Sequence, residues 1–260
     1  MINQKPNFLF IITDQQRADH LGCYGNKIIQ TPNIDRISGA GLTFDKFYVS
    51  CPICMPNRAT LMTGRMPSVN GVLTNGLSLP WSSNTFVHLL RQSGYMTALF
   101  GKSHLQNVAP LRVEDWNYPP GRSGEAPSDA YSDANLSRRS GTLYENERQD
   151  LWVKDHAKEV ALPYYGFDFI QLANNHGDNA GGHYRRWFAS RYKELDSLIG
   201  PRNALPAEDY IAPQAWRTAV PEELYSTAFV EEKTVNYLEK YSTSKQQLKT
   251  YLFKKIIKKS

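Results

Sequence analysis

The chain has 260 residues, of which 41% are hydrophobic and 21% are charged, values that are ordinary for a globular protein. No apolar run is long enough to cross a bilayer, and three cysteines do not suit a disulfide framework. The net charge of +5 comes from residues 243–260, which contain six lysines and no acidic residue. Residues 1–242 are nearly neutral, with 24 basic and 25 acidic residues. A nucleic-acid binder would carry basic groups within its fold, so we expect no nucleic-acid partner.

The order of predicted elements favours a single α/β domain. Strands are predicted over residues 7–13, 42–49, 95–100 and 167–172, and helices over 31–41, 56–64, 85–93 and 221–241. The last helix is predicted to bury Leu224, Ala228, Val235 and Leu238. Alternation of strands and helices indicates a mostly parallel sheet covered on both faces, with 7–13 as a buried strand. Residues 110–150 are polar and rich in turn formers, so we expect a long surface excursion there, a candidate lid.

The N-terminus holds one compact apolar block, Phe8–Ile12. It lacks the longer apolar run and the small-residue cleavage site of a secretory signal. An odd, small number of cysteines also suits a reducing compartment. We therefore expect a cytoplasmic location.

The strongest pattern for chemistry begins at Cys54, which is followed by Met-Pro-Asn-Arg-Ala-Thr-Leu-Met-Thr-Gly-Arg up to Arg65. It places a sulfur nucleophile before a helix N-terminus, where backbone N–H groups and the helix dipole favour an anion. Arg58 lies one turn into this helix and can reach the same anion. Two other interpretations stay open. Cys54 can pack as a small hydrophobe, or it can form a redox pair with Cys51 in a CxxC pattern.

The stretch from Cys54 to Arg65 resembles the signature of the sulfatase family, Cys-x-Pro-x-Arg followed by Leu and Thr-Gly-Arg. The resemblance extends over residues 6–241 and implies an alkaline-phosphatase-like fold. In that family a formylglycine-generating enzyme oxidises the cysteine to formylglycine, whose hydrated aldehyde attacks the sulfur of a sulfate ester. The resemblance therefore implies a small-molecule sulfate ester as substrate, and Cys54 and Arg58 as catalytic residues.

The segment from Ile12 to Asp19 resembles the first metal segment of the same family. The resemblance implies that Asp14 binds a divalent cation, Ca²⁺, as a hard oxygen ligand. Many sulfatases have a second aspartate where Gln15 stands, and an amide oxygen can also bind calcium. The predicted metal ligands are Asp14, Gln15 and the group derived from Cys54.

Two further segments resemble parts of the family that contact the substrate. Gly101–Leu105 is similar to the family's Gly-Lys-x-His-Leu, which implies that Lys102 binds a sulfate oxygen and the nucleophile's hydroxyl. His104 would then assist proton removal from the hydrated aldehyde. His176 lies in a polar segment that resembles bacterial arylsulfatases and phosphonate monoester hydrolases, and we predict that it contacts the substrate. A loop held by ordinary hydrogen bonds is the alternative for His176.

The chain departs from the family pattern after Tyr241. Complete members continue with a strand ending in histidine, an Asp-His-Gly or Asp-Asn-Gly segment, and a lysine, none of which is in this sequence. We therefore expect a partial N-terminal-type sulfatase domain over 1–242 and a non-native continuation over 243–260, such as an out-of-frame end. An amphipathic basic helix with Leu248, Leu252 and Ile256 on one side is the alternative. We expect no membrane contact through its lysines.

The sequence thus predicts a hydrolase of sulfate esters that uses formylglycine and Ca²⁺. We expect the chain as written to lack appreciable activity, because Asp14, Gln15 and the Cys54-derived group leave calcium short of oxygen ligands. The enzymatic alternative is a phosphonate or phosphate ester hydrolase with the same machinery, since these esters resemble sulfate esters in shape and charge. The non-enzymatic alternative is an inactive truncated remnant.

Overall fold

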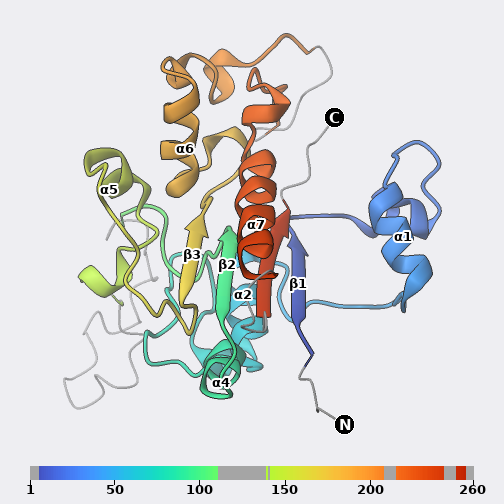
Figure 1. Cartoon of the computed structure of the whole chain (residues 1–260), viewed down its shortest axis with the longest axis vertical. Helices are drawn as coiled ribbons and strands as arrows, with labels where there is room; N and C mark the ends of the chain where they lie inside the picture. Colours follow the sequence, from blue (N-terminus) through green and yellow to red (C-terminus); the bar gives the residue numbers. More distant parts are fainter. Residues whose placement is uncertain (1–5, 111–138, 140, 208–214, 243–249, 256–260) are drawn as a thin grey trace, which may run out of the picture.

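A computed structural model describes residues 6–110, 139, 141–207, 215–242 and 250–255 (Figure 1). Its centre is a sheet of four strands in the order β1-β4-β2-β3, and all three pairings are parallel. The strands are β1 (Phe8–Thr13), β2 (Thr97–Gly101), β3 (Phe169–Leu172) and β4 (Thr250–Lys255). The predicted α/β class with a mostly parallel sheet is confirmed, as are the predicted strands at 7–13, 95–100 and 167–172.

Helices connect the strands and give the sheet its cover. They are α1 (Pro32–Ala40), α2 (Cys54–Thr63), α3 (Pro67–Asn70), α4 (Phe86–Gln92), α5 (Gln149–Lys154), α6 (His183–Arg191) and α7 (Ser226–Ser242). Short 3-10 turns are η1 (Ala18–His20), η2 (Gly22–Tyr24), η5 (Thr142–Tyr144), η6 (Gly177–Asn179), η7 (Leu195–Ser197), η8 (Pro201–Asn203) and η9 (Glu222–Leu224). The predicted helices at 31–41, 56–64 and 85–93 are confirmed with small shifts of their ends.

Strand β2 separates two hydrophobic cores, because successive side chains of a strand point to opposite faces. Leu99 packs into a core with residues of α2 and α4, among them Met55 and Val87. Ala98 and Phe100 pack into a second core with residues of α6 and α7, and α7 crosses the sheet in front of β2 and β4 in Figure 1. The sheet is therefore covered on both faces at β2. This packing holds β2 in place, and Lys102 follows its last residue.

Local signals in the sequence explain where these helices begin and end. Thr85 caps α4 by accepting a hydrogen bond from the His88 backbone N–H. Helix α2 ends at Gly64, whose φ of +66° is a left-handed conformation that glycine adopts without strain. The hydroxyl of Thr97 donates to the carbonyl of Gly166 over 2.7 Å, so β2 is tied to the turn before β3.

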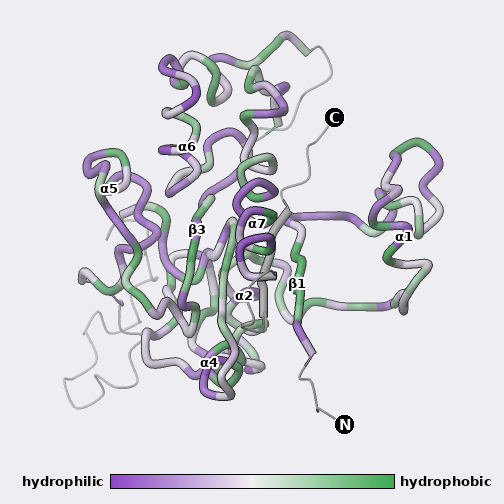
Figure 2. Tube along the Cα trace, in the orientation of Figure 1, coloured by the Kyte–Doolittle hydropathy of each residue, from purple (hydrophilic) through white to green (hydrophobic). Residues whose placement is uncertain are grey.

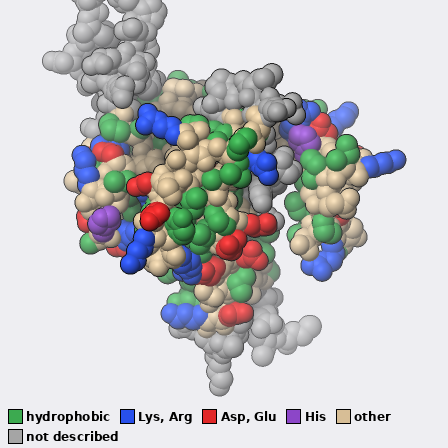
Figure 3. Space-filling model, turned by 90° about the horizontal axis from the view of Figure 1, so that it is seen from above, with side chains coloured by type: hydrophobic (Ala, Val, Ile, Leu, Met, Phe, Trp, Pro, Cys, Tyr) green, Lys and Arg blue, Asp and Glu red, His purple; other side chains and the backbone are tan. Residues whose placement is uncertain are grey.

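Residues 7–13 form the predicted strand, but the prediction that this strand is buried is wrong. Strand β1 lies at the edge of the sheet, and the side chains of Phe8, Leu9, Phe10 and Ile11 are exposed. In Figure 2 this strand is coloured as hydrophobic. An edge strand has a neighbour on one side alone, and helix α1 does not lie against it. Figures 1 and 3 both show the lobe that contains α1 standing apart from the main body.

The predicted strand at 42–49 is also wrong, since these residues have no regular secondary structure. Their apolar side chains are exposed, with Phe47 at 79% and Tyr48 at 82% of full accessibility. An alternating apolar pattern forms a strand where backbone N–H and C=O groups find a partner strand. No such partner lies beside 42–49 among the residues that the structure describes.

Two further predictions need correction. The surface excursion predicted over 110–150 falls largely on residues outside the described ranges, but its end is wrong because Asn146 and Glu147 are buried. The last predicted helix begins at Ser226, since Tyr225 before it has an extended conformation that ends η9. Its buried side chains are Phe229, Val230 and Tyr237, together with partly buried Ala228 and Leu238, while Val235 is exposed.

Strand β4 occupies the middle of the sheet. Its first residue, Thr250, pairs with Phe8 of β1 on one side and with Thr97 of β2 on the other. The alternative of a basic helix is therefore wrong over 250–255, while Leu248 and Ile256 lie outside the described residues. The predicted domain boundary at residue 242 stays a prediction. Within the described ranges, no helix is both long and apolar enough to span a membrane.

The turn before β3 yields a test of the fold. Gly166 has a φ of +96°, and an added Cβ would lie 2.7 Å from the His88 backbone nitrogen. We expect Gly166→Ala to lower the free energy of unfolding by about 3 kcal/mol or more, because backbone strain and a clash add up. Gly25→Ala is the matched control, since its φ is +92° and nothing lies within 4 Å of the added Cβ. It should cost about 1 kcal/mol. Equal losses in urea unfolding would contradict this account of the turn.

Candidate active site

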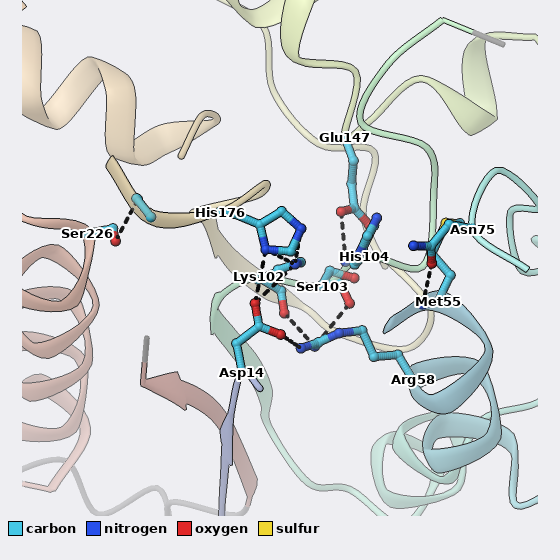
Figure 4. A network of polar contacts seen from close by, with 11 residues as sticks. Asp14, Met55, Arg58, Asn75, Lys102, Ser103, His104, Glu147, His176 and Ser226 are labelled. Atoms are coloured by element: carbon cyan, nitrogen blue, oxygen red, sulfur yellow. Dashed lines mark hydrogen bonds and ion pairs between the residues drawn. The ribbon is translucent and has the colours of Figure 1, made fainter. Parts of the chain in front are cut away.

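Three strands end at one edge of the sheet, and their ends bring the predicted site residues together. Asp14 follows β1, Lys102 follows β2, and His176 lies in the loop after β3. In open parallel sheets, ligands bind outside the carboxyl ends of the strands. Arg58 reaches the same place from the first turns of α2, and Figure 4 shows these side chains pointing toward one another. The structure therefore assembles four of the predicted residues from four separate segments.

The carboxylate of Asp14 is the centre of this cluster. Its Oδ2 lies 3.2 Å from Lys102 Nζ and 3.4 Å from His176 Nδ1, and its Oδ1 lies 3.6 Å from Arg58 Nη2. The Lys102 ammonium also lies 3.2 Å from Nδ1 and 3.3 Å from Nε2 of His176. The Lys102 side chain is fully buried, whereas that of His176 is 58% exposed. His176 is thus the residue of the cluster that faces solvent.

Helix α2 contributes both Cys54 and Arg58. Cys54 is the first residue of the helix and is partly buried, so its side chain lies where the backbone N–H groups are unpaired by the helix itself. The Met55 N–H donates to Asn75 Oδ1 over 3.0 Å, which holds this end of the helix. Arg58 Nη1 donates to the carbonyl of Lys102 over 3.1 Å, which ties α2 to the loop after β2.

Burial acts against both cations of the site. It lowers the pKa of the Lys102 ammonium below its ordinary value, while the charges of Asp14 and Cys54 oppose this change. Burial likewise lowers the pKa of the Arg58 guanidinium, and Asp14 again opposes it most strongly, followed by Cys54. Arg58 stands four residues after Cys54 on α2, and its guanidinium reaches the Lys102 carbonyl. An anion held beside Cys54 would meet two positive groups that water does not screen.

His104 comes from the same loop as Lys102. Its side chain is buried, its backbone φ is +55°, and its ring meets the ring of His176 edge to face at 6.4 Å between centroids. A left-handed φ is uncommon for a residue other than glycine, so other contacts must hold it. The His104 backbone N–H donates to Glu147 Oε2 over 2.8 Å. His104, the predicted catalytic histidine, is therefore close to the cluster, and its backbone is held by Glu147.

Glu147 is the site residue that the sequence pattern missed. It is fully buried, and its segment was expected on the surface. No motif marks it, but the apolar residues Leu151 and Trp152 that follow were an available signal that the chain returns to the core there. Trp152 is indeed buried, and its indole N–H donates to the carbonyl of Asn146 over 2.7 Å.

The described residues do not make a complete calcium site. Calcium takes six to eight oxygen ligands, and no group of three or more His, Cys, Asp or Glu side chains is arranged for a metal within the described part of the chain. Asp14 is the carboxylate that contacts Lys102 and Arg58, and Gln15 is exposed with a φ of +46° that turns the chain after β1. Asp14 and Gln15 as metal ligands stay a prediction.

The comparison with known proteins gives the family. Residues 6–145, more than half of the chain, match the profile of the Sulfatase family. The protein belongs to the sulfatase family. Cys54, Arg58, Lys102 and His104 all lie within the matched region, while His176 lies beyond it.

Individual sulfatases resemble parts of this chain. N-acetylglucosamine-6-O-sulfatase of Bacteroides thetaiotaomicron is 37% identical over 119 residues, which cover 46% of this chain and 21% of that protein. Human steryl-sulfatase is 38% identical over 126 residues, which cover 44% of this chain and 22% of that protein. The chain therefore matches less than a quarter of the length of either relative.

The fold extends the likeness to nearly the whole chain. The crystal structure of the phosphonate monoester hydrolase of Agrobacterium radiobacter superposes with a TM-score of 0.61 over 97% of this chain and 41% of that chain, at 23% identity. This likeness shows the alkaline-phosphatase-like fold, including the sheet whose strand ends carry the site.

The charge balance of the cluster can be tested at Asp14. Asp14→Asn should lower the pKa of Lys102 further, because the strongest group opposing burial of the ammonium is removed. The measurement is an NMR titration of the Lys102 side chain. Asp19→Asn is the control, since Asp19 pairs with Arg17 at an exposed position. A Lys102 pKa that is unchanged in Asp14→Asn, or that moves equally in both variants, would contradict the assigned cause.

Proposed function

We propose that this protein hydrolyses sulfate esters by means of a nucleophile derived from Cys54. The observation that carries the proposal is the place of Cys54 at the start of α2, the helix whose Arg58 contacts the Lys102 carbonyl and the Asp14 carboxylate at the strand ends. A sulfate ester is an anion with three terminal oxygens, and these cations supply donors for such a group. Membership of the sulfatase family supports the same reaction.

Cys54 fits conversion to formylglycine, which the family signature implies. Pro56 and Arg58 stand at the second and fourth positions after it, and Cys54 is partly buried at the first residue of α2. The modified residue supplies a hydrated aldehyde whose hydroxyl can attack sulfur. A formylglycine-generating enzyme is then a required partner.

The chain's own residues bind and orient the substrate anion. Arg58 is preorganised by its hydrogen bond to the Lys102 carbonyl, so little side-chain entropy is lost when it contacts a sulfate oxygen. Lys102 is held between Asp14 and His176, and its ammonium can donate one of its N–H groups to an oxygen of the incoming sulfate. Donors fixed in this way stabilise charge that develops in the transition state at no cost of reorganisation.

The two histidines have different tasks in this proposal. Buried His104 lies toward the base of the site and would accept the proton of the attacking hydroxyl. Exposed His176 would contact the ester on the solvent side. A divalent cation is part of the proposal through the family alone, with Asp14 and Gln15 as the residues that would hold it.

Conversion of Cys54 is the first test. Co-expression with a formylglycine-generating enzyme should replace the Cys54 thiol by an aldehyde, which peptide mass spectrometry detects as loss of sulfur. Cys23 and Cys51 should remain thiols, because neither has proline at the second and arginine at the fourth position after it. An unmodified Cys54 beside a converted control sulfatase would contradict the proposal.

Removal of either buried cation is the second test. Arg58→Ala and Lys102→Ala should each weaken binding of inorganic sulfate about ten-fold or more, as expected for a lost charge-assisted hydrogen bond. In a version of the protein completed to the length of its relatives, each should also lower kcat for an aryl sulfate by about 10²–10³. Titration calorimetry and steady-state kinetics with added Ca²⁺ are the measurements. Arg36→Ala and Lys193→Ala remove exposed cations and are the matched controls. Binding and kcat at the unmutated level in either site variant would remove that residue from the site.

The choice between sulfate and phosphonate esters needs a direct comparison. Two cations and a nucleophile suit both ester types, because both present tetrahedral anions. Rates of the converted protein, completed to the length of its relatives, on an aryl sulfate and an aryl phosphonate, measured side by side, separate the two. A higher kcat/KM for the phosphonate would replace the sulfate ester in the proposal while leaving the site residues in their roles.

A further inference from the structure

Glu147 is a buried carboxylate that the proposed chemistry does not use. Its Oε1 accepts hydrogen bonds from the N–H of Leu105 over 3.0 Å, the N–H of Gln106 over 3.1 Å and the hydroxyl of Tyr164 over 2.6 Å. Its Oε2 accepts the N–H of His104 over 2.8 Å. Four donors meet one carboxylate, and three of them are consecutive backbone N–H groups of the loop after β2.

Such a set of contacts requires an acceptor with no proton of its own. An ionised carboxylate accepts at both oxygens, whereas a carboxamide or a protonated carboxyl group presents a donor at one of them. Burial raises the pKa of Glu147, and the hydrogen bonds of Tyr164 and of the three backbone groups oppose that change. The anionic form is the one that satisfies all four donors.

The segment around Glu147 also reaches the loop after β3. The side-chain amide of Asn174 donates to the backbone carbonyl of Glu147. Two residues further on, Gln149 donates to the carbonyl of Asn179 over 2.8 Å and accepts from Asn175 over 2.8 Å. One short segment therefore holds both the loop that carries Lys102 and His104 and the loop that carries His176.

We propose that Glu147 is a positioning residue of the active site, whose carboxylate fixes the loop after β2 and so holds Lys102 and His104 against Asp14 and Arg58. In Figure 4 it lies behind His104, on the side away from Asp14. It acts through the backbone N–H groups of His104, Leu105 and Gln106 in that loop. The kinetic part of this inference rests on the proposed function, while the structural part does not.

Glu147→Gln is the diagnostic substitution, since it keeps the size of the side chain and removes the charge. The amide oxygen can serve the three donors at the Oε1 position, but the NH₂ group then faces the N–H of His104 as a second donor. We expect hydrogen-exchange protection of the His104 amide to fall about ten-fold or more, because a buried donor has lost its acceptor. The amides of Leu105 and Gln106 should change less. NMR of the ¹⁵N-labelled chain reads these amides individually.

A second measurement follows Lys102 without any turnover. Its buried amine should react slowly with acetic anhydride in the unmutated protein, and Glu147→Gln should raise the rate of acylation at Lys102 about ten-fold or more. Mass spectrometry of the Lys102 peptide gives the rate. Glu232→Gln is the matched control, because Glu232 accepts hydrogen bonds from Trp187 and Arg191 on the far side of the fold. It should leave both readings unchanged.

Each outcome decides the inference. Fast exchange of the His104, Leu105 and Gln106 amides in the unmutated protein would overturn it, whether or not Glu147→Gln folds. Acylation of Lys102 at the unmutated rate in a folded Glu147→Gln variant would also overturn it and leave Glu147 as a structural residue. If the converted protein, completed to the length of its relatives, hydrolyses no sulfate ester, the proposed function fails, and the two other measurements still decide the role of Glu147.

Discussion

The site depends on the compensation of buried positive charge. An ammonium and a guanidinium removed from water carry a large desolvation penalty, which close negative partners must offset. Asp14 supplies that partner for Lys102 and Arg58, and Cys54 and then Glu147 favour the charged form of Arg58 to a smaller extent. The strand ends, the start of α2 and the buried loop are arranged around this requirement. An incoming anion would meet cations already oriented by their structural partners.

Segments that carry their own local signals could be predicted from the sequence. The apolar run before Asp14, the helix that begins near Cys54 and the strand before Lys102 follow from short patterns, and the structure has a strand, a helix and a strand at these positions. Patterns that depend on a distant partner gave wrong results. Residues 42–49 alternate like a strand but find no partner among the described residues, and β1 is apolar yet exposed at the sheet edge.

The role of Glu147 lay beyond sequence reasoning for the same reason. A glutamate in a polar stretch is usually solvated, and its burial here follows from donors that lie about forty residues away in the loop after β2 and from the hydroxyl of Tyr164. The motif around Lys102 predicts which side chains would face a ligand, whereas the residue that holds their backbone can come from any segment that packs against the loop. The resemblance to a family therefore pointed to the side chains that the structure brings together, but not to Glu147, which holds the backbone of their loop.

The strand order has a consequence for the way the molecule is made. Strands β1 and β2 carry Asp14 and Lys102, but they are not neighbours, because β4 lies between them. The register joins Phe8 to Thr250, so the pairing that brings Asp14 to Lys102 closes a loop of nearly the full chain length. Contacts of such high sequence separation form slowly. During synthesis on the ribosome, β1 and β2 cannot take their places beside β4 until β4 has emerged. The ion pair between Asp14 and Lys102 is therefore expected to form late in folding.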